Sequence, residues 1–183
     1  EQIYHLSVDN SFPYWVYGTQ QDAGAIRTRS RGNLGAITPM DWNPVPGWEW
    51  GTIVPDPLDP NTVYSTGNGV IKITYPSEQW INVSPAADPS RRLRRTSSAP
   101  IVFAPWNKHM LLAAFQSVWS TTDAGAHWTA LSPDLGFRGD LSGPASTGSI
   151  ESMRASTVGT GIIWVGTNNG LIKLTRNGGK TWE

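Results

Sequence analysis

Residues 121–128 read Thr-Thr-Asp-Ala-Gly-Ala-His-Trp and lie between two runs of β-branched and aromatic residues. The Asp123 carboxylate can accept hydrogen bonds from backbone N–H groups two or three residues further on, which closes a tight turn. Gly125 can adopt a positive φ because it has no Cβ. The Thr121 hydroxyl can hold the start of the turn, and Trp128 can bury a large ring between neighbouring sheets. The stretch therefore predicts a hairpin turn of the pattern T-x-D-x-G-x-x-W.

The same pattern occurs at the end of the chain, where residues 175–182 read Thr-Arg-Asn-Gly-Gly-Lys-Thr-Trp. Thr175, Gly179 and Trp182 repeat the spacing, and Asn177 stands where the first copy has its aspartate. Because each position that the two copies share has a role in closing a turn, we interpret both copies as structural rather than catalytic.

A longer repeat shows that these turns belong to larger units. Residues 63–74 (VYSTGNGVIKIT) resemble residues 164–175 (WVGTNNGLIKLT), which lie 101 residues later. Thr121 lies 47 residues after Thr74 and 54 residues before Thr175, so a third unit falls between the two. A period of about 50 residues is typical of β-propeller blades.

Each unit divides into four short strands separated by turn residues, and no stretch convincingly predicts a helix. We predict an all-β fold, a single β-propeller segment over residues 1–183, with four-stranded antiparallel blades at about 1–45, 46–84, 97–133 and 147–183. The predicted strands are 4–8, 14–18, 25–29 and 37–42; 51–54, 62–66, 70–75 and 80–83; 100–103, 110–115, 118–121 and 127–131; and 149–155, 162–166 and 171–175, with a further strand beginning at Trp182.

The composition of the chain argues against several kinds of partner and cofactor. The chain has 183 residues with 14 basic and 14 acidic side chains, so its net charge gives no argument for nucleic acid. No apolar run reaches the roughly 18–20 residues of a membrane span, so we expect no membrane insertion. The absence of cysteine excludes disulfides and thiolate metal sites. His5, His109 and His127 lack metal-ligand spacing, so we expect neither a metal nor another cofactor.

The two turns resemble the Asp-box, or bacterial neuraminidase repeat (BNR), which is found at hairpins of β-propellers. Residues 4–22, 55–61 and 132–135 extend the resemblance to large, mostly secreted bacterial BNR-repeat proteins with sortilin-like or xyloglucanase-like propellers, often labelled glycosyl hydrolases. Residues 75–80 (Tyr-Pro-Ser-Glu-Gln-Trp) depart from the pattern because they keep the tryptophan but lose the aspartate and glycine. The resemblance implies a secreted, periplasmic or cell-surface protein. It says little about chemistry, because propellers carry many functions.

The strand order predicts which loops could form a site. Since successive strands are antiparallel, two kinds of loop lie on the face opposite the two turns: those between the second and third strands of a blade, and those that join one blade to the next. Propeller ligands usually bind on that face. The candidate residues there are Gln20, Gln21 and Asp22; Trp48, Glu49 and Trp50; Arg91, Arg92, Arg94 and Arg95; and Glu151 and Arg154.

These residues support several kinds of chemistry. Trp48 and Trp50 flank a carboxylate and could form a platform for stacking a sugar ring, or they could pack between blades. Asp22, Glu49 and Glu151 are the candidate catalytic carboxylates. A glycosidase needs two carboxylates, roughly 6.5–9.5 Å apart for inversion and about 5–5.5 Å apart for retention. The four arginines could bind an anionic group, or they could be solvated or form salt bridges.

Three functions remain open at this stage. The chain could be a non-catalytic propeller that binds a glycan or a protein, part of a glycoside hydrolase acting on polysaccharide, or a structural subunit of a larger assembly. We also expect the chain to be part of a larger propeller, with the remainder of that propeller or another protein chain as its partner. The alternative is a self-contained ring of four blades.

Overall fold

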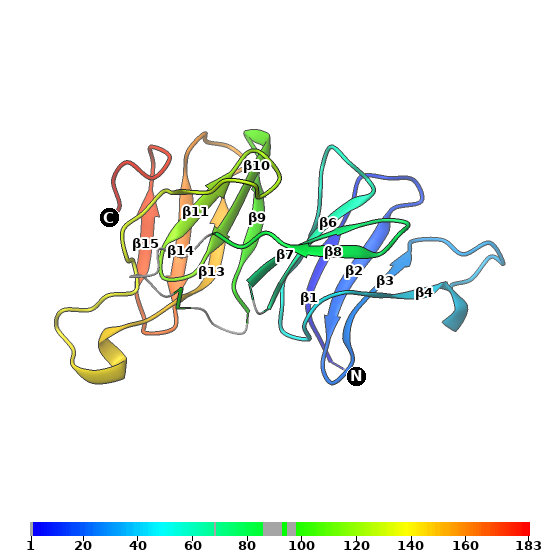
Figure 1. Cartoon of the computed structure of the whole chain (residues 1–183), viewed down its shortest axis with the longest axis horizontal. Helices are drawn as coiled ribbons and strands as arrows, with labels where there is room; N and C mark the ends of the chain where they lie inside the picture. The colour runs from blue at the N-terminus through cyan, green and yellow to red at the C-terminus, as the bar shows by residue number, and fades with distance from the viewer. Residues whose placement is uncertain (1, 68, 86–92, 95–97) are drawn as a thin grey trace. The chain divides into compact units, whose positions relative to one another are not determined.

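The computed structural model describes residues 2–67, 69–85, 93–94 and 98–183 (Figure 1). The chain forms two compact units, Glu1–Val83 and Ser84–Glu183, and each is described by itself. Helical structure in the described residues is confined to two short 3₁₀ turns, Pro39–Asp41 and Gly143–Ser146. No helix among these residues is long and apolar enough to span a membrane.

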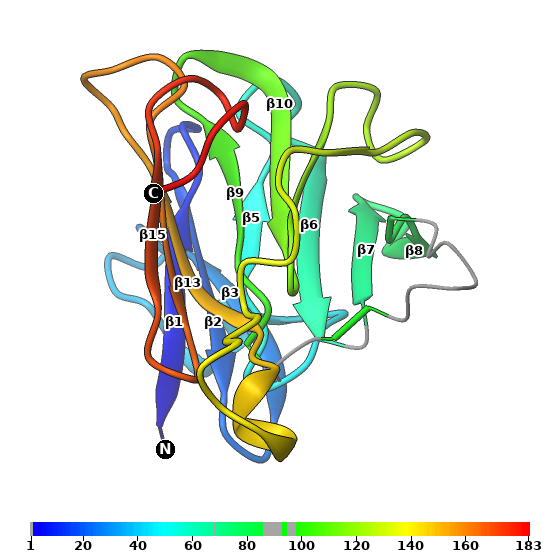
Figure 2. The ribbon, with the colours of Figure 1, turned by 90° about the vertical axis from the view of Figure 1, so that its left-hand side faces the viewer.

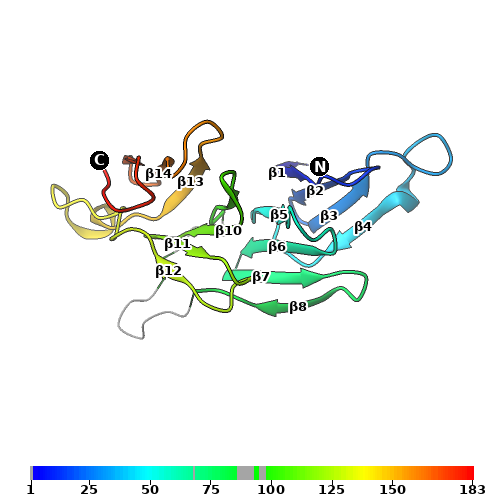
Figure 3. The same ribbon diagram turned by 90° about the horizontal axis from the view of Figure 1, so that it is seen from above.

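The first unit contains two four-stranded antiparallel sheets whose strands follow one another in chain order. The first strand of the second sheet lies against the first two strands of the first sheet (Figure 3). Buried side chains from both sheets form one core: Tyr17, Ala25, Val45, Ile53, Val63, Ile73 and Tyr75. The strands are β1 (Ile3–Val8), β2 (Trp15–Gln20), β3 (Gly24–Arg29) and β4 (Trp42–Val45), then β5 (Ile53–Pro55), β6 (Thr62–Gly67), β7 (Gly69–Thr74) and β8 (Gln79–Asn82).

The second unit is built in the same way. One four-stranded sheet is followed by a 3₁₀ turn and a three-stranded sheet (Figure 2). Beyond the last strand, Glu183 exchanges two backbone hydrogen bonds of 2.9 Å with Leu174, so a fourth strand begins where the sequence predicts it. The strands are β9 (Ile101–Ala104), β10 (Asn107–Ala114), β11 (Val118–Thr121) and β12 (Thr129–Ala130), then β13 (Ile150–Ala155), β14 (Ile163–Thr167) and β15 (Ile172–Thr175).

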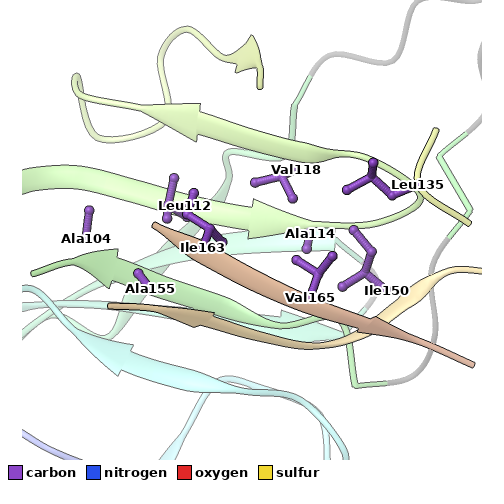
Figure 4. Close-up of a cluster of buried hydrophobic side chains, with 9 residues drawn as sticks. All are labelled: Ala104, Leu112, Ala114, Val118, Leu135, Ile150, Ala155, Ile163 and Val165. Carbon is purple, nitrogen blue, oxygen red and sulfur yellow. The ribbon is translucent and has the colours of Figure 1, made fainter. Parts of the chain in front are cut away.

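A cluster of aliphatic side chains joins the two sheets of the second unit (Figure 4). Along β14, Ile163 and Val165 are buried in this cluster while Trp164 is exposed, which is the period of two expected of a half-buried strand. Trp182 packs against the cluster and donates its indole N–H to the Leu131 carbonyl at 3.1 Å. The turn that ends the second sheet is thereby attached to the first sheet of the unit.

The predicted all-β fold of antiparallel propeller blades is confirmed, with two blades in each unit. Within each unit the first strands of the two sheets are neighbours, β1 with β5 and β9 with β13. Sheets that approach one another at their first strands have the arrangement of propeller blades.

The last strand of the first blade begins five residues later than expected. Residues 37–42 were expected to form the last strand of the first blade, but β4 starts at Trp42. The Asp41 carboxylate accepts hydrogen bonds from the Thr38 backbone N–H at 2.7 Å and from its hydroxyl at 2.9 Å. Together with Pro39 in the first position, this cap favours the 3₁₀ turn over an extended strand.

The first turn closes through the groups that the sequence pattern indicated. The Asp123 Oδ1 atom accepts hydrogen bonds from the Thr121 hydroxyl at 2.8 Å and from the His127 backbone N–H at 2.9 Å. The Thr121 oxygen in turn accepts the Gly125 backbone N–H at 3.0 Å. Ala124 and Gly125 have φ values of 60° and 89°, so this glycine sits in a conformation that side chains disfavour.

The second turn has the same geometry. Asn177 Oδ1 accepts hydrogen bonds from the Thr175 hydroxyl at 3.0 Å and from the Thr181 backbone N–H at 3.0 Å. The Thr175 oxygen accepts the Gly179 backbone N–H at 2.9 Å. An amide and a carboxylate therefore close equivalent turns, which supports the structural role predicted for both.

The buried threonine of the turn provides a test of this role. In Thr121→Val the shape is kept, but the Gly125 N–H loses its acceptor and stays buried. We expect the free energy of unfolding to fall by about 1–3 kcal/mol, measured by denaturant unfolding. Thr121→Ser keeps the hydroxyl and is the control; equal stability of the valine and serine variants would contradict a structural role for the hydrogen bond.

The turn should also respond to acid. Hydrogen bonds from the His127 backbone and side chain, and then from Thr121, lower the pKa of Asp123 to about 2. A carboxyl whose pKa is lowered on folding stabilises the folded state above its unfolded pKa of about 4, and this contribution is lost as the pH falls from about 4 to about 2. We expect Asp123→Asn to remove this part of the acid dependence of the melting temperature. An unchanged acid profile in the variant would contradict the assignment.

Candidate functional site

A pocket of about 410 Å³ lies in the first unit, between the segment that follows β4 and one face of the second sheet. Its lining combines two indole rings with aliphatic, glycine and small polar residues. The lining residues are Pro46, Gly47, Trp48, Ser65, Thr66, Gly67, Gly69, Ile71, Trp80 and Asn82. A mainly apolar cavity with a few polar groups is the usual composition of a small-ligand site.

Strand register explains why these residues meet. Ser65 on β6 is opposite Ile71 on β7, and Ile71 is opposite Asn82 on β8. Residues directly opposite one another across antiparallel strands project from the same face of the sheet. Trp80 precedes Asn82 by two positions and so shares that face.

Glycine determines where the Trp48 ring lies. The Trp48 carbonyl accepts the Gly51 backbone N–H at 3.1 Å, which forms a turn at this point of the chain. The indole then lies against Gly67 so closely that a Cβ there would overlap the ring. Trp48 remains 52% exposed and Trp80 57% exposed, so both rings offer surface to a ligand.

The pocket also contains an unsatisfied polar group. The Ser65 hydroxyl is buried, and no hydrogen-bond partner for it lies among the described residues. It lies against Gly47, so closely that a Cβ at that position would overlap the hydroxyl oxygen. A buried hydroxyl without a partner costs free energy, and a ligand hydroxyl that bonded to it would remove that cost.

The structure brings the Asp22 backbone to the Glu49 side chain, and the contact is not one between two carboxyl groups. A Glu49 carboxylate oxygen accepts the Asp22 backbone N–H at 2.5 Å, in a turn where Asp22 has a φ of 60°. The contact holds this turn to the segment before β5. Nearby, the Tyr4 hydroxyl donates to Gln21 at 2.9 Å, and Gln20 is buried in β2.

The other predicted residues are distributed differently. Trp50 is 42% exposed and does not line the pocket, so Trp48 is paired with Trp80 rather than with Trp50. In the second unit, Glu151 and Arg154 are exposed on β13. Arg94 forms an ion pair with Asp134 at 2.6 Å and donates to the Gly148 carbonyl at 3.1 Å, so it ties loops together. The remaining predicted arginines, Arg91, Arg92 and Arg95, lie outside the described residues.

Sequence analysis missed Trp80, Ser65 and Asn82 as site residues. The sequence pattern identified Trp80 only as the tryptophan that is retained in a degenerate turn. The signal that could have identified it as a site residue is its spacing of two from Asn82 on β8, because both then project from the face that also carries Ile71 of β7. Among the described residues, no group of three or more His, Cys, Asp or Glu side chains could hold a metal ion.

Comparison with known proteins identifies the fold. No family model and no curated protein matches this sequence. Among solved structures, the chain is similar over 99% of its length to a GH74 enzyme of Niastella koreensis, with a TM-score of 0.59 and 17% identity. It is similar over its whole length to the extracellular domain of a protein described as a hybrid two-component system of B. thetaiotaomicron, with a TM-score of 0.62 and 11% identity.

Both of these structures are β-propellers, and at such low identity the likeness shows the fold alone. The chain spans 29% of the first protein and 23% of the second. Membership of the Asp-box family stays a prediction from the two turns.

Proposed function

We propose that this chain is a carbohydrate-binding β-propeller module that takes a sugar unit of a glycan in the pocket between Trp48 and Trp80. The observation that carries the proposal is the combination of two half-exposed indole rings with the buried, unpartnered Ser65 hydroxyl in one cavity. A pyranose ring presents an apolar face and a rim of hydroxyl groups. The indoles match the face, and the hydroxyl of Ser65 and the amide of Asn82 match the rim.

The structural neighbours agree with this function without establishing it. One is an enzyme of the GH74 group and the other is an extracellular domain of a two-component system. We extend to this chain the extracellular setting of the second, and so propose a secreted or cell-surface protein. Both the proposed extracellular location and the lining of the pocket favour a glycan as the partner.

Glycoside hydrolysis is the second candidate, because Asp22 and Glu49 are neighbours in the first unit. A hydrolase needs one carboxyl group that protonates the leaving group and another that attacks or activates water. Here the Glu49 carboxylate is engaged by a backbone N–H, which gives it a role in holding a turn. Binding without hydrolysis is therefore the function that the geometry supports better.

The test is a panel of soluble glycans that includes β-glucans, xyloglucan and sialosides. Binding is measured by titration calorimetry, and release of reducing ends is measured in the same samples. The proposal expects saturable binding to at least one glycan with no product. No binding across the panel would contradict it, and product formation would favour the hydrolase.

A further inference from the structure

The first sheet carries a face without charged side chains, here called the uncharged face. Residues that are opposite one another on antiparallel strands project from the same side of a sheet, so the register of β1–β4 assigns its members. Ile3 belongs to it as well, because its side chain and that of Leu6 both lie 3.4 Å from where a Cβ of Gly18 would stand. The face includes Ile3, Leu6, Val8, Val16, Gly18, Ile26, Thr28, Trp42 and Pro44.

Much of the uncharged face is open to solvent. Leu6 is 70% exposed, Val8 57% and Trp42 49%, and Val16 and Ile26 are partly exposed. Four strands about 4.8 Å apart, each of about six residues with a rise of about 3.3 Å, give the face an area of roughly 300–400 Å². A contiguous apolar patch of this size on a protein surface commonly marks an interaction site. The uncharged face is therefore a candidate interface.

The second sheet shows what such a face packs against. Residues 17–19 (Tyr-Gly-Thr) align with residues 64–66 (Tyr-Ser-Thr), and the strand pairings agree with this alignment. The uncharged face therefore corresponds to the face of the second sheet that carries Ser65. Val63 and Ile73 project from that face and are fully buried in the core that joins the two sheets of the unit. The equivalent face of the second sheet is thus covered by a neighbouring blade.

The third sheet repeats this arrangement. Val118 lies 47 residues after Ile71, which is the offset of the repeat. It pairs with Ala114 as Ile71 pairs with Ser65, so the two pairs occupy equivalent faces. Val118 and Ala114 are buried in the cluster to which the fourth sheet contributes. In both units, therefore, the neighbouring blade covers a face of this kind.

We propose that the uncharged face of the first sheet is the docking surface for a further propeller blade, which packs on it as the first sheet packs on the second. A face without charge can be covered by another sheet without leaving an unpaired ion in the interface. The two propeller structures to which the chain is similar contain more chain than the 29% and 23% that it spans. The inference does not depend on the proposed binding of glycans.

The area of the face favours a blade over a second copy of this chain. Each partner in a stable complex of free proteins usually buries about 800 Å², which is roughly twice the area of the uncharged face. A blade connected through the polypeptide needs less area, because the connection gives it a high effective concentration. The face also has the dimensions of one four-stranded sheet, since it extends across all of β1–β4.

Thiol labelling tests the proposal, because the chain contains no cysteine. Leu6→Cys is introduced into the 183-residue chain and into the whole product of the gene that encodes it, and the rate of reaction with a maleimide is followed at that peptide by mass spectrometry. In the 183-residue chain the thiol should react as an exposed group. In the whole gene product we expect the reaction to be roughly tenfold slower or more, because the covering blade must first separate.

The matched control is Val158→Cys, at a loop position of the second unit that is 96% exposed. It should react at the same rate in both samples. Equal reactivity of Leu6→Cys in the two samples would overturn the inference. Protection of both positions would also overturn it, because the slower reaction would then not be specific to the uncharged face.

A charged substitution provides an independent measurement. Leu6→Glu should lower the melting temperature of the whole gene product by about 2–4 °C, because it buries a carboxylate in an apolar interface, and should leave that of the 183-residue chain unchanged. Val158→Glu should change neither. Sedimentation of the 183-residue chain distinguishes the other occupant. A monomer agrees with the proposal, whereas a dimer that Leu6→Glu separates would assign the face to a second copy and overturn it.

Discussion

Replacing Trp48 with alanine is expected to weaken glycan binding by roughly 100-fold, because a tryptophan at the centre of a binding site commonly contributes 2 kcal/mol or more. Trp48 supplies one of the two indoles that face the cavity. Its ring lies against the Gly67 backbone and is about half exposed, so its removal does not open the core formed by the two sheets. The loss should therefore appear in affinity and not in folding.

The measurement is titration calorimetry with the tightest ligand of the glycan panel, together with a thermal melt of each variant. Trp50→Ala is the matched control, because Trp50 is two residues away and exposed but does not line the pocket. The control should bind within about twofold of the wild type. If the Trp48 variant did so as well, or if both variants lost binding equally, the pocket would not be the site.

Leu112→Ala is expected to cause a large loss of stability, about 2–5 kcal/mol in the free energy of unfolding. Leu112 is fully buried on β10, within the cluster that joins the two sheets of the second unit (Figure 4). Truncation removes its packing with residues such as Ile163 and leaves a cavity that the surrounding strands cannot close without breaking their register. Denaturant unfolding followed by circular dichroism measures the change.

The control for this prediction is Leu141→Ala, which removes the same atoms from a side chain that is 39% exposed in the same unit. We expect that variant to lose no more than about 0.5 kcal/mol. A loss below about 1 kcal/mol in the Leu112 variant would show that the cluster does not stabilise the unit as its burial indicates.

The sequence by itself determined the blades and their turns. The turn at residues 121–128 is closed by hydrogen bonds between residues no more than four apart. The eight residues of this stretch therefore determine the conformation of the turn almost by themselves. The same pattern at residues 175–182 predicted a second turn of the same geometry. Asn177 stands there in place of aspartate, and its side-chain oxygen accepts the equivalent backbone N–H. Strand type was predictable for a similar reason, because the alternation of buried and exposed side chains is a local property.

Strand ends were less predictable. The 3₁₀ turn Pro39–Asp41 displaces the start of β4 because a capping interaction outweighs the propensity of the preceding residues for a strand. The same limit applies to Asp22 and Glu49. The sequence predicted only that both carboxylates lie on one face of the propeller, and the structure alone shows that the Glu49 carboxylate accepts the Asp22 backbone N–H.

Tertiary structure alone decided where the candidate sites lie. Trp48 and Trp80 line one pocket because Gly67 admits an indole against the backbone and because the register of β6, β7 and β8 turns Trp80 to the same face. The stacking of Arg27 on Tyr75 likewise joins residues of different sheets. Each of these contacts depends on how whole sheets pack, and the free energy that selects such packing comes from burial of many side chains at once, so no short stretch of sequence encodes it.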